Sequence, residues 1–132
     1  MYTLTVQPRF SETDALGHLN NTTLPVWFEQ ARTPIFKLFV PTLAINDWNL
    51  ILAKTEIEFV REIFYGHDVK IKTYIEHLGN SSFVVYQEVW QQQQLAAKGR
   101  ATMVHFDHDT KKSMSIPDAI RKVLSEHLVE KK

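Results

Sequence analysis

The chain has 132 residues, 44% hydrophobic and 23% charged, a composition typical of one globular domain spanning residues 1–132. Fifteen Lys and Arg balance fifteen Asp and Glu, so no net charge favours nucleic acid or an anionic membrane as a partner. The lack of cysteine excludes disulfides, thiolate metal sites and cysteine nucleophiles. No apolar run approaches the roughly 20 residues of a membrane helix, and residues 1–8 lack the features of a secretory signal. We therefore expect a soluble cytoplasmic protein without membrane insertion.

A strand and a buried helix are predicted in the first third of the chain. Residues 2–10 alternate loosely around apolar positions, as a strand does, and a polar loop follows over residues 11–23. Residues 24–39 are apolar on nearly all sides of a helix, and such helices are usually buried. Pro34 removes one backbone hydrogen bond, so we expect a kink, or a helix end near Thr33 and a restart at Pro34.

The remainder of the chain predicts four long antiparallel strands and a terminal helix. From residue 48 apolar residues recur with period two, and one face is expected to hold Ile51, Ala53, Thr55, Ile57 and Phe59. Strands over residues 69–76, 83–91 and 95–107 follow, separated by turn signals. Both faces of the 83–91 strand are largely apolar, which predicts a covering layer from another subunit or the C-terminal segment. Residues 118–130 have the spacing of an amphipathic helix, so the whole pattern indicates an α+β fold.

The polar loop before the helix holds the candidate catalytic groups. It carries one carboxylate, one imidazole and two amides, in Asp14, His18, Asn20 and Asn21. Unpaired N–H groups at a helix start suit an oxygen that becomes negative during a reaction. Asp14 lies seven residues before Asn21, so a folded-back loop would bring its carboxylate near those donors, an arrangement for attacking a carbonyl. Because Asp is common in turns, the residues alone favour a local turn role for Asp14.

The loop and the helix together resemble a family signature. The run Thr13-Asp14-x-x-Gly17-His18-x-Asn20-Asn21, then Trp27-Phe28-Glu29-x-Ala31-Arg32, resembles that of hotdog-fold acyl-CoA thioesterases of the 4-hydroxybenzoyl-CoA thioesterase type. Further similar runs follow in order: Glu58-Phe59-x-Arg61, Tyr65-Gly66-x-Asp68-Val69, Gly79-x-Ser81-Ser82-Phe83, Gln87-Glu88-Val89, Ala97-x-Gly99 and Ile116-Pro117. The likeness covers nearly the whole chain.

This resemblance implies the hotdog fold, in which an antiparallel β-sheet wraps around a long central helix. It implies an acyl-CoA thioesterase that releases a carboxylic acid and CoA without a cofactor. Asp14 stands at the family's catalytic carboxylate position and would act as a nucleophile or as a general base on water. The backbone amide at Asn21 would polarise the thioester carbonyl. The resemblance also implies a homodimer or homotetramer with active sites at a subunit interface.

Other residues are assigned to substrate binding or to the shape of the loop. His18 would orient substrate, position water or shuttle a proton, and a loop histidine bonded to backbone is an equal alternative. Gly17 permits the tight turn that returns Asp14 towards the helix, and Asn20 braces the loop. Ser81 and Ser82 fit a turn, or a contact near the substrate cleft.

Several charged residues have assignments of their own. Arg61, Lys98 and Arg100 are candidates for binding the phosphates of CoA, although charges on strand faces are usually only solvated. Glu29 and Arg32 are three residues apart on the predicted helix, so we expect them to form an ion pair.

The same residues leave two alternatives to an acyl-CoA thioesterase, and one further cluster has to be weighed as a metal site. His105 and Asp107 would share a strand face as metal ligands do, but a strand ending in a polar turn explains residues 105–109 more simply, so no metal site is predicted. An acyl-carrier-protein thioesterase would act on the same acyl group attached to a carrier protein. A non-catalytic acyl-thioester-binding dimer would bind acyl-CoA without releasing a thiol.

Overall fold

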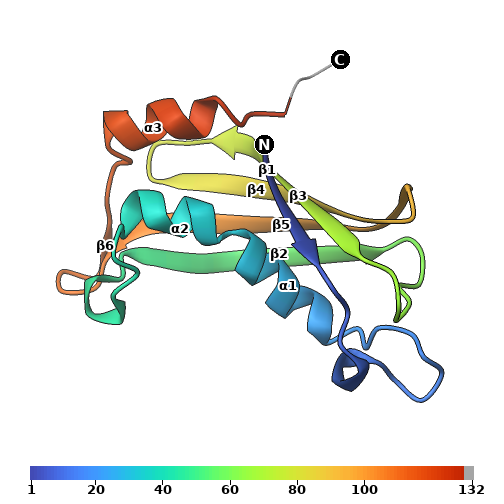
Figure 1. Ribbon diagram of the computed structural model, residues 1–132. Coiled ribbons are helices and arrows are strands. Elements are labelled where there is room, and N and C mark those ends of the chain that lie inside the picture. Colours follow the sequence, from blue (N-terminus) through green and yellow to red (C-terminus); the bar gives the residue numbers. More distant parts are fainter. Residues whose placement is uncertain (130–132) are drawn as a thin grey trace.

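The computed structural model describes residues 1–129, which form a curled antiparallel sheet packed against helices (Figure 1). The strands are β1 (Tyr2–Val6), β2 (Leu50–Phe59), β3 (Val69–Leu78), β4 (Ser82–Gln91), β5 (Gln94–Asp107) and β6 (Lys112–Ser113). Their order across the sheet is β1-β3-β4-β5-β2, and β6 pairs with β5. We expected four consecutive strands linked by hairpins. Hairpins do join β3 to β4 and β4 to β5, but β2 pairs with β5 and not with β3, so β1 and β2 lie at the two edges of this order.

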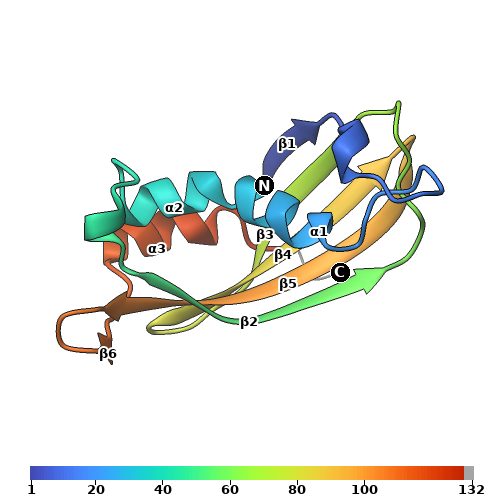
Figure 2. The same cartoon turned by 90° about the horizontal axis from the view of Figure 1, so that it is seen from below.

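Helices α1 (Thr23–Ala31) and α2 (Thr33–Phe39) lie over one face of the sheet (Figure 2). Pro34 stands in the first turn of α2, where its missing N–H removes no hydrogen bond, so the predicted break near Thr33 is confirmed. Helix α3 (Asp118–Ser125) buries Leu124 in the same cluster as residues of α2. Two short 3-10 helices, η1 (Phe10–Glu12) and η2 (Ile45–Asp47), complete the described elements. None of the helices within residues 1–129 has the length and apolar character needed to span a membrane.

The inward face of the sheet and the helices share an apolar core. Every second residue of β3 is buried from Val69 to Ile75, and the same alternation runs along β4, as the period-two pattern predicted. The helices contribute the buried residues Leu24, Trp27, Phe28, Ala31, Ile35 and Phe39. Each large apolar side chain buried in this way stabilises the fold by about 1.5–3 kcal/mol. The packing therefore fixes the start of α1, where the loop over residues 11–23 attaches.

Helix α1 packs tightly against the sheet at Gly99 of β5. A Cβ atom added to Gly99 would lie 2.9 Å from Cε2 of Phe28, which is closer than real Cβ contacts. The absence of a side chain at this position therefore sets how near the helix can pack.

A buried polar side chain ties α1 to the middle of the sheet. Gln87 of β4 is 1% exposed and donates from Nε2 to the Phe28 carbonyl oxygen at 3.0 Å and to Thr73 Oγ1 at 3.0 Å. Its Oε1 accepts from Nη1 of Arg32 at 3.3 Å. Burying an amide is costly unless it is hydrogen bonded, and three bonds satisfy most of its capacity.

The face assignment in β2 was partly wrong. The register against β5 shifts between Leu52 and Lys54, which indicates a bulge at Ala53. On one side of the bulge Ile51 pairs with Val104 and lies on the outer face, whereas Ile57 pairs with Gly99 on the inner face. A strict period of two cannot anticipate an inserted residue, because one extra residue moves the rest of the strand to the opposite face.

The outer face of β4 has no covering layer within residues 1–129. Helix α3 packs into the inner core instead, so the C-terminal segment described here does not cover β4. The outer side chains contact one another: Glu88 accepts hydrogen bonds from the Tyr86 hydroxyl at 2.9 Å and from Trp90 Nε1 at 3.1 Å. Burial, together with the Glu88 carboxylate, raises the pKa of Tyr86 to about 12. Lys72 lies over the Trp90 ring.

The chain after α3 returns to the sheet. Helix α3 ends at Ser125 rather than at residue 130, and Glu130 lies outside the described residues. The N–H of Ile75 donates to the His127 carbonyl at 2.8 Å, and Val129 donates back to Ile75 at 2.8 Å. β1 pairs with β3 only from Val69 to Thr73, so the segment after α3 pairs with the next part of β3, at Ile75.

Candidate active site

The loop over residues 11–23 is folded into a narrow turn by its own backbone. Thr13 and Leu19 form an antiparallel bridge, and the N–H of Asp14 donates to the His18 carbonyl at 2.8 Å. Gly17, at the tip, has a φ of +80°, a left-handed conformation that favours glycine. The turn that Gly17 was expected to permit is therefore present.

Glu12 fastens this loop to α1. Its Oε2 accepts from Trp27 Nε1 at 2.9 Å, and its Oε1 accepts from the backbone N–H of Arg9 at 2.7 Å. Partial burial opposes the charge on Glu12, but the bonds from Arg9 and Trp27 outweigh it, so the pKa of Glu12 lies below its ordinary value. No local pattern marks this role, because the two anchored residues are fifteen positions apart.

The segment following β2 forms the opposite wall. The N–H of Leu19 donates to the Ile63 carbonyl at 2.7 Å, and His18 forms an isolated bridge with Phe64. Gln91 at the end of β4 holds the wall from behind: its Oε1 accepts from the Phe64 N–H at 3.0 Å, and its Nε2 donates to the carbonyls of Phe64 and His67 at 2.8 and 2.9 Å.

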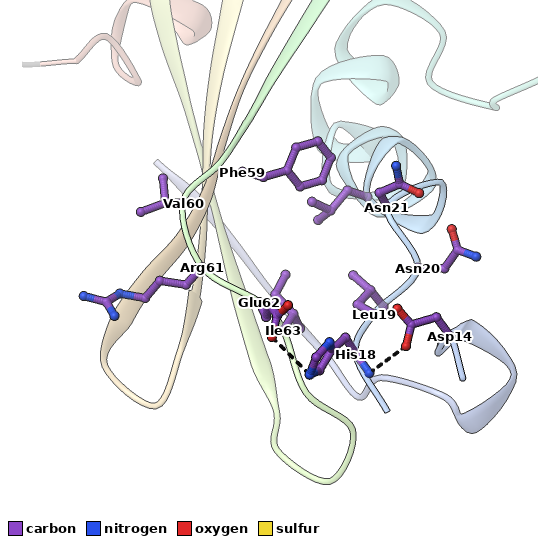
Figure 3. A pocket seen from close by; sticks show the side chains of 11 residues that line it. Asp14, His18, Leu19, Asn20, Asn21, Phe59, Val60, Arg61, Glu62 and Ile63 are labelled. Atoms are coloured by element: carbon purple, nitrogen blue, oxygen red, sulfur yellow. Dashed lines mark hydrogen bonds and ion pairs between the residues drawn. The ribbon is translucent and has the colours of Figure 1, made fainter. Parts of the chain in front are cut away.

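A cleft of about 420 Å³ lies between these two segments (Figure 3). Its lining comprises Asp14, His18, Leu19, Asn20, Asn21, Leu24, Phe59, Val60, Arg61, Glu62 and Ile63. The loop, the start of α1 and the residues after β2 therefore enclose one space. Five of the eight predicted site residues line it, namely Asp14, His18, Asn20, Asn21 and Arg61, whereas Gly17 supports the turn beside it.

The carboxylate of Asp14 has one bonded and one unbonded oxygen. Oδ1 accepts from the N–H of Leu16 at 2.8 Å and from that of His18 at 3.2 Å. The local turn role suggested by the residue type is therefore real. Among the described residues nothing donates a hydrogen bond to Oδ2. Two backbone bonds fix the carboxylate and leave its second oxygen available for chemistry.

The start of α1 supplies an available donor in the same cleft. Asn20 accepts at Oδ1 from the N–H and the hydroxyl of Thr22, at 3.0 and 2.9 Å, and so braces the turn into the helix. The backbone N–H of Asn21, one residue later, has no acceptor in the described part of the chain. Asn21 lies just before Thr22, the N-cap of α1, so its N–H belongs to the turn that leads into the helix and not to the first helical turn that was expected.

His18 contacts a residue that the sequence did not single out. Its Nε2 lies 3.0 Å from Oε2 of Glu62 (Figure 3). Its ring also packs edge to face against the Phe64 ring, with centroids 5.1 Å apart. The His18 side chain is 24% exposed, so the ring is held between the two walls. Glu62 directly follows the Glu58-Phe59-x-Arg61 run, but no spacing rule connects it to a histidine 44 positions earlier.

Three predicted residues lie away from the centre of the cleft. The Arg61 side chain extends away from Asp14 and Asn21 (Figure 3). Ser82 pairs with Val104 of β5, whereas Phe59 in the cleft wall pairs with Ala97. Seven residues of strand separate these two levels, roughly 23 Å, so Ser81 and Ser82 stand at the far end of the same sheet.

The remaining charged candidates do not converge on a metal site. His105 is 7% exposed, and its Nδ1 lies 3.1 Å from the Ser115 carbonyl. Asp107 accepts from the backbone of Asp109 at 2.9 Å, within its own turn. No group of three His, Asp or Glu side chains in residues 1–129 could hold a metal ion. Glu29 and Arg32 form no ion pair within 4.0 Å among these residues, so that expectation was wrong, because Arg32 turns under the helix to Gln87.

The curled antiparallel sheet around a central helix is the hotdog fold, so the expected fold class is confirmed. A family model described as the thioesterase-like superfamily matches residues 8–124. The chain belongs to the thioesterase-like superfamily, and this membership indicates a thioester hydrolase.

Solved structures support the same class. A predicted thioesterase from Bacillus stearothermophilus is 44% identical, with a TM-score of 0.94 over 99% of this chain and 98% of that one. A thioesterase from Thermus thermophilus, complexed with coenzyme A and Zn, is 28% identical, with a TM-score of 0.81 over 92% and 94% of the two chains.

One curated relative also matches. The uncharacterized protein YsmA of Bacillus subtilis is 28% identical over 81 residues. The match covers 61% of this chain and 55% of YsmA, so the chain spans little more than half the length of that relative.

Proposed function

We propose that this protein is an acyl-CoA thioesterase, which hydrolyses an acyl-CoA to a carboxylic acid and free CoA. The observation that carries the proposal is the pairing of an unbonded carboxylate oxygen, Oδ2 of Asp14, with the unbonded N–H of Asn21 in one cleft of the described chain. A nucleophile or base opposite an oxyanion donor is what thioester hydrolysis requires. The Thermus thermophilus relative that holds coenzyme A supports CoA as the thiol carrier.

Two mechanisms follow from this geometry. If Asp14 is the nucleophile, Oδ2 attacks the thioester carbon, the C–S bond breaks, and CoA leaves as a thiolate that takes a proton. Water then hydrolyses the resulting anhydride and releases the acid. If Asp14 is a general base, Oδ2 takes a proton from water as the water oxygen attacks the thioester carbon directly; the C–S bond then breaks, and CoA leaves as a thiolate that takes the proton from Asp14. In both cases the Asn21 N–H stabilises the negative carbonyl oxygen.

Hydrolysis in ¹⁸O-labelled water under single-turnover conditions tests for the nucleophilic mechanism, because only that mechanism can label Asp14. General-base catalysis places the label in the released acid alone, and so does attack of water on the acyl side of the anhydride. Nucleophilic catalysis, with water attacking the Asp14 side of the anhydride, places it in the Asp14 carboxylate, where mass spectrometry of the peptide over residues 11–23 detects it.

The other cleft residues have supporting roles in the proposal. His18 orients the attacking water or substrate, and Glu62, 3.0 Å away, holds its ring. Asn20 and Gly17 shape the loop. Arg61 at the rim is suited to a phosphate of CoA, because guanidinium groups bind phosphate with several hydrogen bonds. Ser81 and Ser82 would contact the substrate only in a cleft completed by a second copy of the chain.

We propose that two chains form a homodimer along β2. Such a dimer could be the final assembly, or two of them could pair into a homotetramer. Within the described residues β2 pairs on one side only, with β5, so its outer edge is open. Large apolar residues cluster on and after this strand, with Leu52 45% exposed, Phe59 55% and Val60 46%. An open edge with exposed apolar side chains is a template for pairing with another strand.

The charges of β2 favour an antiparallel pairing centred on Thr55. In that register Lys54 of one copy faces Glu56 of the other, twice by symmetry, and opposite charges across a strand pair are favourable. In a single chain Lys54 and Glu56 pair with each other at 2.6 Å. A two-fold axis perpendicular to the sheet keeps both α1 helices on one face, so two clefts would adjoin the same interface.

A panel of short, long and aromatic acyl-CoAs, monitored by free thiol, tests the activity. Release of CoA from at least one member is expected. Binding without thiol release would instead support a non-catalytic acyl-thioester-binding dimer. Faster turnover of the same acyl group on acyl carrier protein would support an acyl-carrier-protein thioesterase, and equal rates on matched oxygen esters would support a general esterase.

A further inference from the structure

The wall of the cleft formed by residues 60–67 is held at two points by the end of the β4–β5 hairpin. The first point is the carbonyl of Ala96, at a bulge of β5, which accepts from the N–H groups of Val60 and Arg61, both at 2.9 Å. The second point is the side chain of Gln91 on β4. Both sets of bonds lie within one chain, and neither uses the outer edge of β2 along which we propose dimerisation.

Gln91 holds the second point with both polar groups of its side chain. The residue is 7% exposed. Its Oε1 accepts from the Phe64 N–H at 3.0 Å, and its Nε2 donates to the carbonyls of Phe64 and His67 at 2.8 and 2.9 Å. A primary amide has two donor hydrogens, so both are used. The two backbone polar groups of Phe64 are therefore fixed relative to β4.

On its other side, Phe64 contacts the loop that carries Asp14. Phe64 lies opposite His18 in an isolated antiparallel bridge, and the two rings pack edge to face. The backbone of His18 bonds to Asp14 twice: its carbonyl accepts from the Asp14 N–H at 2.8 Å, and its N–H donates to Asp14 Oδ1 at 3.2 Å (Figure 3). Strand β4 is therefore connected through Phe64 and His18 to Asp14, the proposed catalytic carboxylate.

We propose that Gln91 is a positioning residue for the reaction, a role that rests on the thioesterase function proposed above. Gln91 does not line the cleft of Asp14. It acts through Phe64 and His18, and it sets where the Asp14 carboxylate lies relative to the reacting carbonyl. Misplacement of a catalytic group by about 1 Å can cost about 10²-fold in rate, so the bonds of this one amide affect the chemical step as well as stability.

Gln91→Met removes the three bonds at nearly constant side-chain length, and Gln87→Met is the matched control. Both amides lie on the buried face of β4 and make three hydrogen bonds, but those of Gln87 go to α1, to Arg32 after it and to β3. Both variants should lose stability in urea unfolding, because buried backbone or side-chain groups lose their partners. Only Gln91→Met should lower kcat per folded molecule, by about 10- to 100-fold, with KM within about twofold of the wild type.

Nuclear magnetic resonance measures the same displacement without a substrate. The N–H groups of Leu16 and His18 donate to Asp14 Oδ1 at 2.8 and 3.2 Å, so their amide signals report the position of the carboxylate. These signals should shift in Gln91→Met and should keep their wild-type positions in Gln87→Met. A wild-type chain that released no thiol would refute the proposed function, and the signals alone would then decide whether Gln91 positions Asp14.

The positioning role is overturned if the two signals do not move in Gln91→Met, if both variants move them equally, or if kcat falls equally in both. Phe64→Ala decides the question if Gln91→Met does not fold. The Phe64 residue is 44% exposed, and this substitution keeps the backbone bonds to Gln91, so the fold should be retained. Loss of the ring contact with His18 should move the Leu16 signal and lower kcat about threefold. If neither changes, the proposal is overturned.

Discussion

The two sides of α1 differ in how their polar groups are satisfied. On the side facing β3 and β4, the amide of Gln87 is fully buried and bonds to Phe28, Thr73 and Arg32. On the side facing β2, Oδ2 of Asp14, the N–H of Asn21 and Nε of Arg32 have no partner within residues 1–129. Asp14 and Asn21 are exposed, so water reaches their unpaired atoms, whereas the buried amide of Gln87 depends on its three bonds within the chain. The first side therefore contributes to stability, and the proposed function assigns the second side to the ligand.

Substitution of Asp14, on the β2 side of α1, should have the largest effect on activity and should leave stability unchanged. Asp14→Asn keeps an oxygen that accepts from the amides of Leu16 and His18, so Tm should not change. It removes the base or nucleophile, and kcat/KM should fall by about 10² to 10⁴-fold. Thiol release and thermal melting measure the two effects.

Asp107 offers a matched control for Asp14. It makes the same kind of turn, accepting from the N–H of Asp109 at 2.9 Å, but it lies outside the cleft. Asp107→Asn should leave thiol release unchanged. Retention of most wild-type activity by Asp14→Asn would exclude the catalytic role.

A change at Gly99 tests the stability side. In Gly99→Ala the new Cβ would meet the Phe28 ring at 2.9 Å, and overpacking of this kind costs about 1–3 kcal/mol of unfolding free energy. Urea denaturation measures the loss, while thiol release per folded molecule should stay near the wild-type value. An unchanged midpoint would mean that α1 does not pack against β5 as closely as described.

Charge reversal on β2 tests the proposed pairing. Lys54→Glu should place like charges opposite each other at two symmetric positions and weaken dimerisation about tenfold, more at low salt. The double variant Lys54→Glu, Glu56→Lys should restore it. Sedimentation velocity at several concentrations measures the dimer constant, and a double variant as weak as the single one would exclude this register.

The smallest expected effect is the contribution of Glu12 to the loss of stability at acidic pH. Its pKa in the folded chain lies below the ordinary 4.5, so its contribution is present above the ordinary pKa and is lost as pH falls through the folded value. Glu12→Gln should lose less stability than the wild type on acidification below about pH 4. Trp27→Phe removes one of the donors and should shift the limb in the same direction. Thermal melts between about pH 3 and pH 7 measure both, and identical acid limbs in all three proteins would contradict this account.

Much of the fold followed from local pattern. The alternation in β3 and β4, the turns at Gly66 and Gly79 and the break before Pro34 each depend on neighbouring residues, so they were predictable. The bulge at Ala53 was not, because it depends on the partner strand.

The site divides in the same way. Asp14 and Asn21 lie on one short loop, so sequence alone could bring them together. The contacts made by Glu62, Gln91 and Glu12 join positions that are 15 to 44 residues apart in the chain. Only the tertiary fold supplies those pairs. Arg32 was misassigned because its spacing to Glu29 describes an exposed helix, whereas the side chain is buried.

The Gln91 side chain has a consequence for how the cleft accommodates ligands. Its side-chain amide accepts from one backbone N–H and donates to two backbone carbonyls, as the backbone of a neighbouring strand would. These bonds hold the irregular segment from Phe64 to His67 in place. The amide hydrogen of Phe64 should therefore exchange as slowly as one in a paired strand. With the proposed acyl-CoA substrates, we expect this wall to keep its shape around different acyl groups, so that selection among them would depend on which shapes fit.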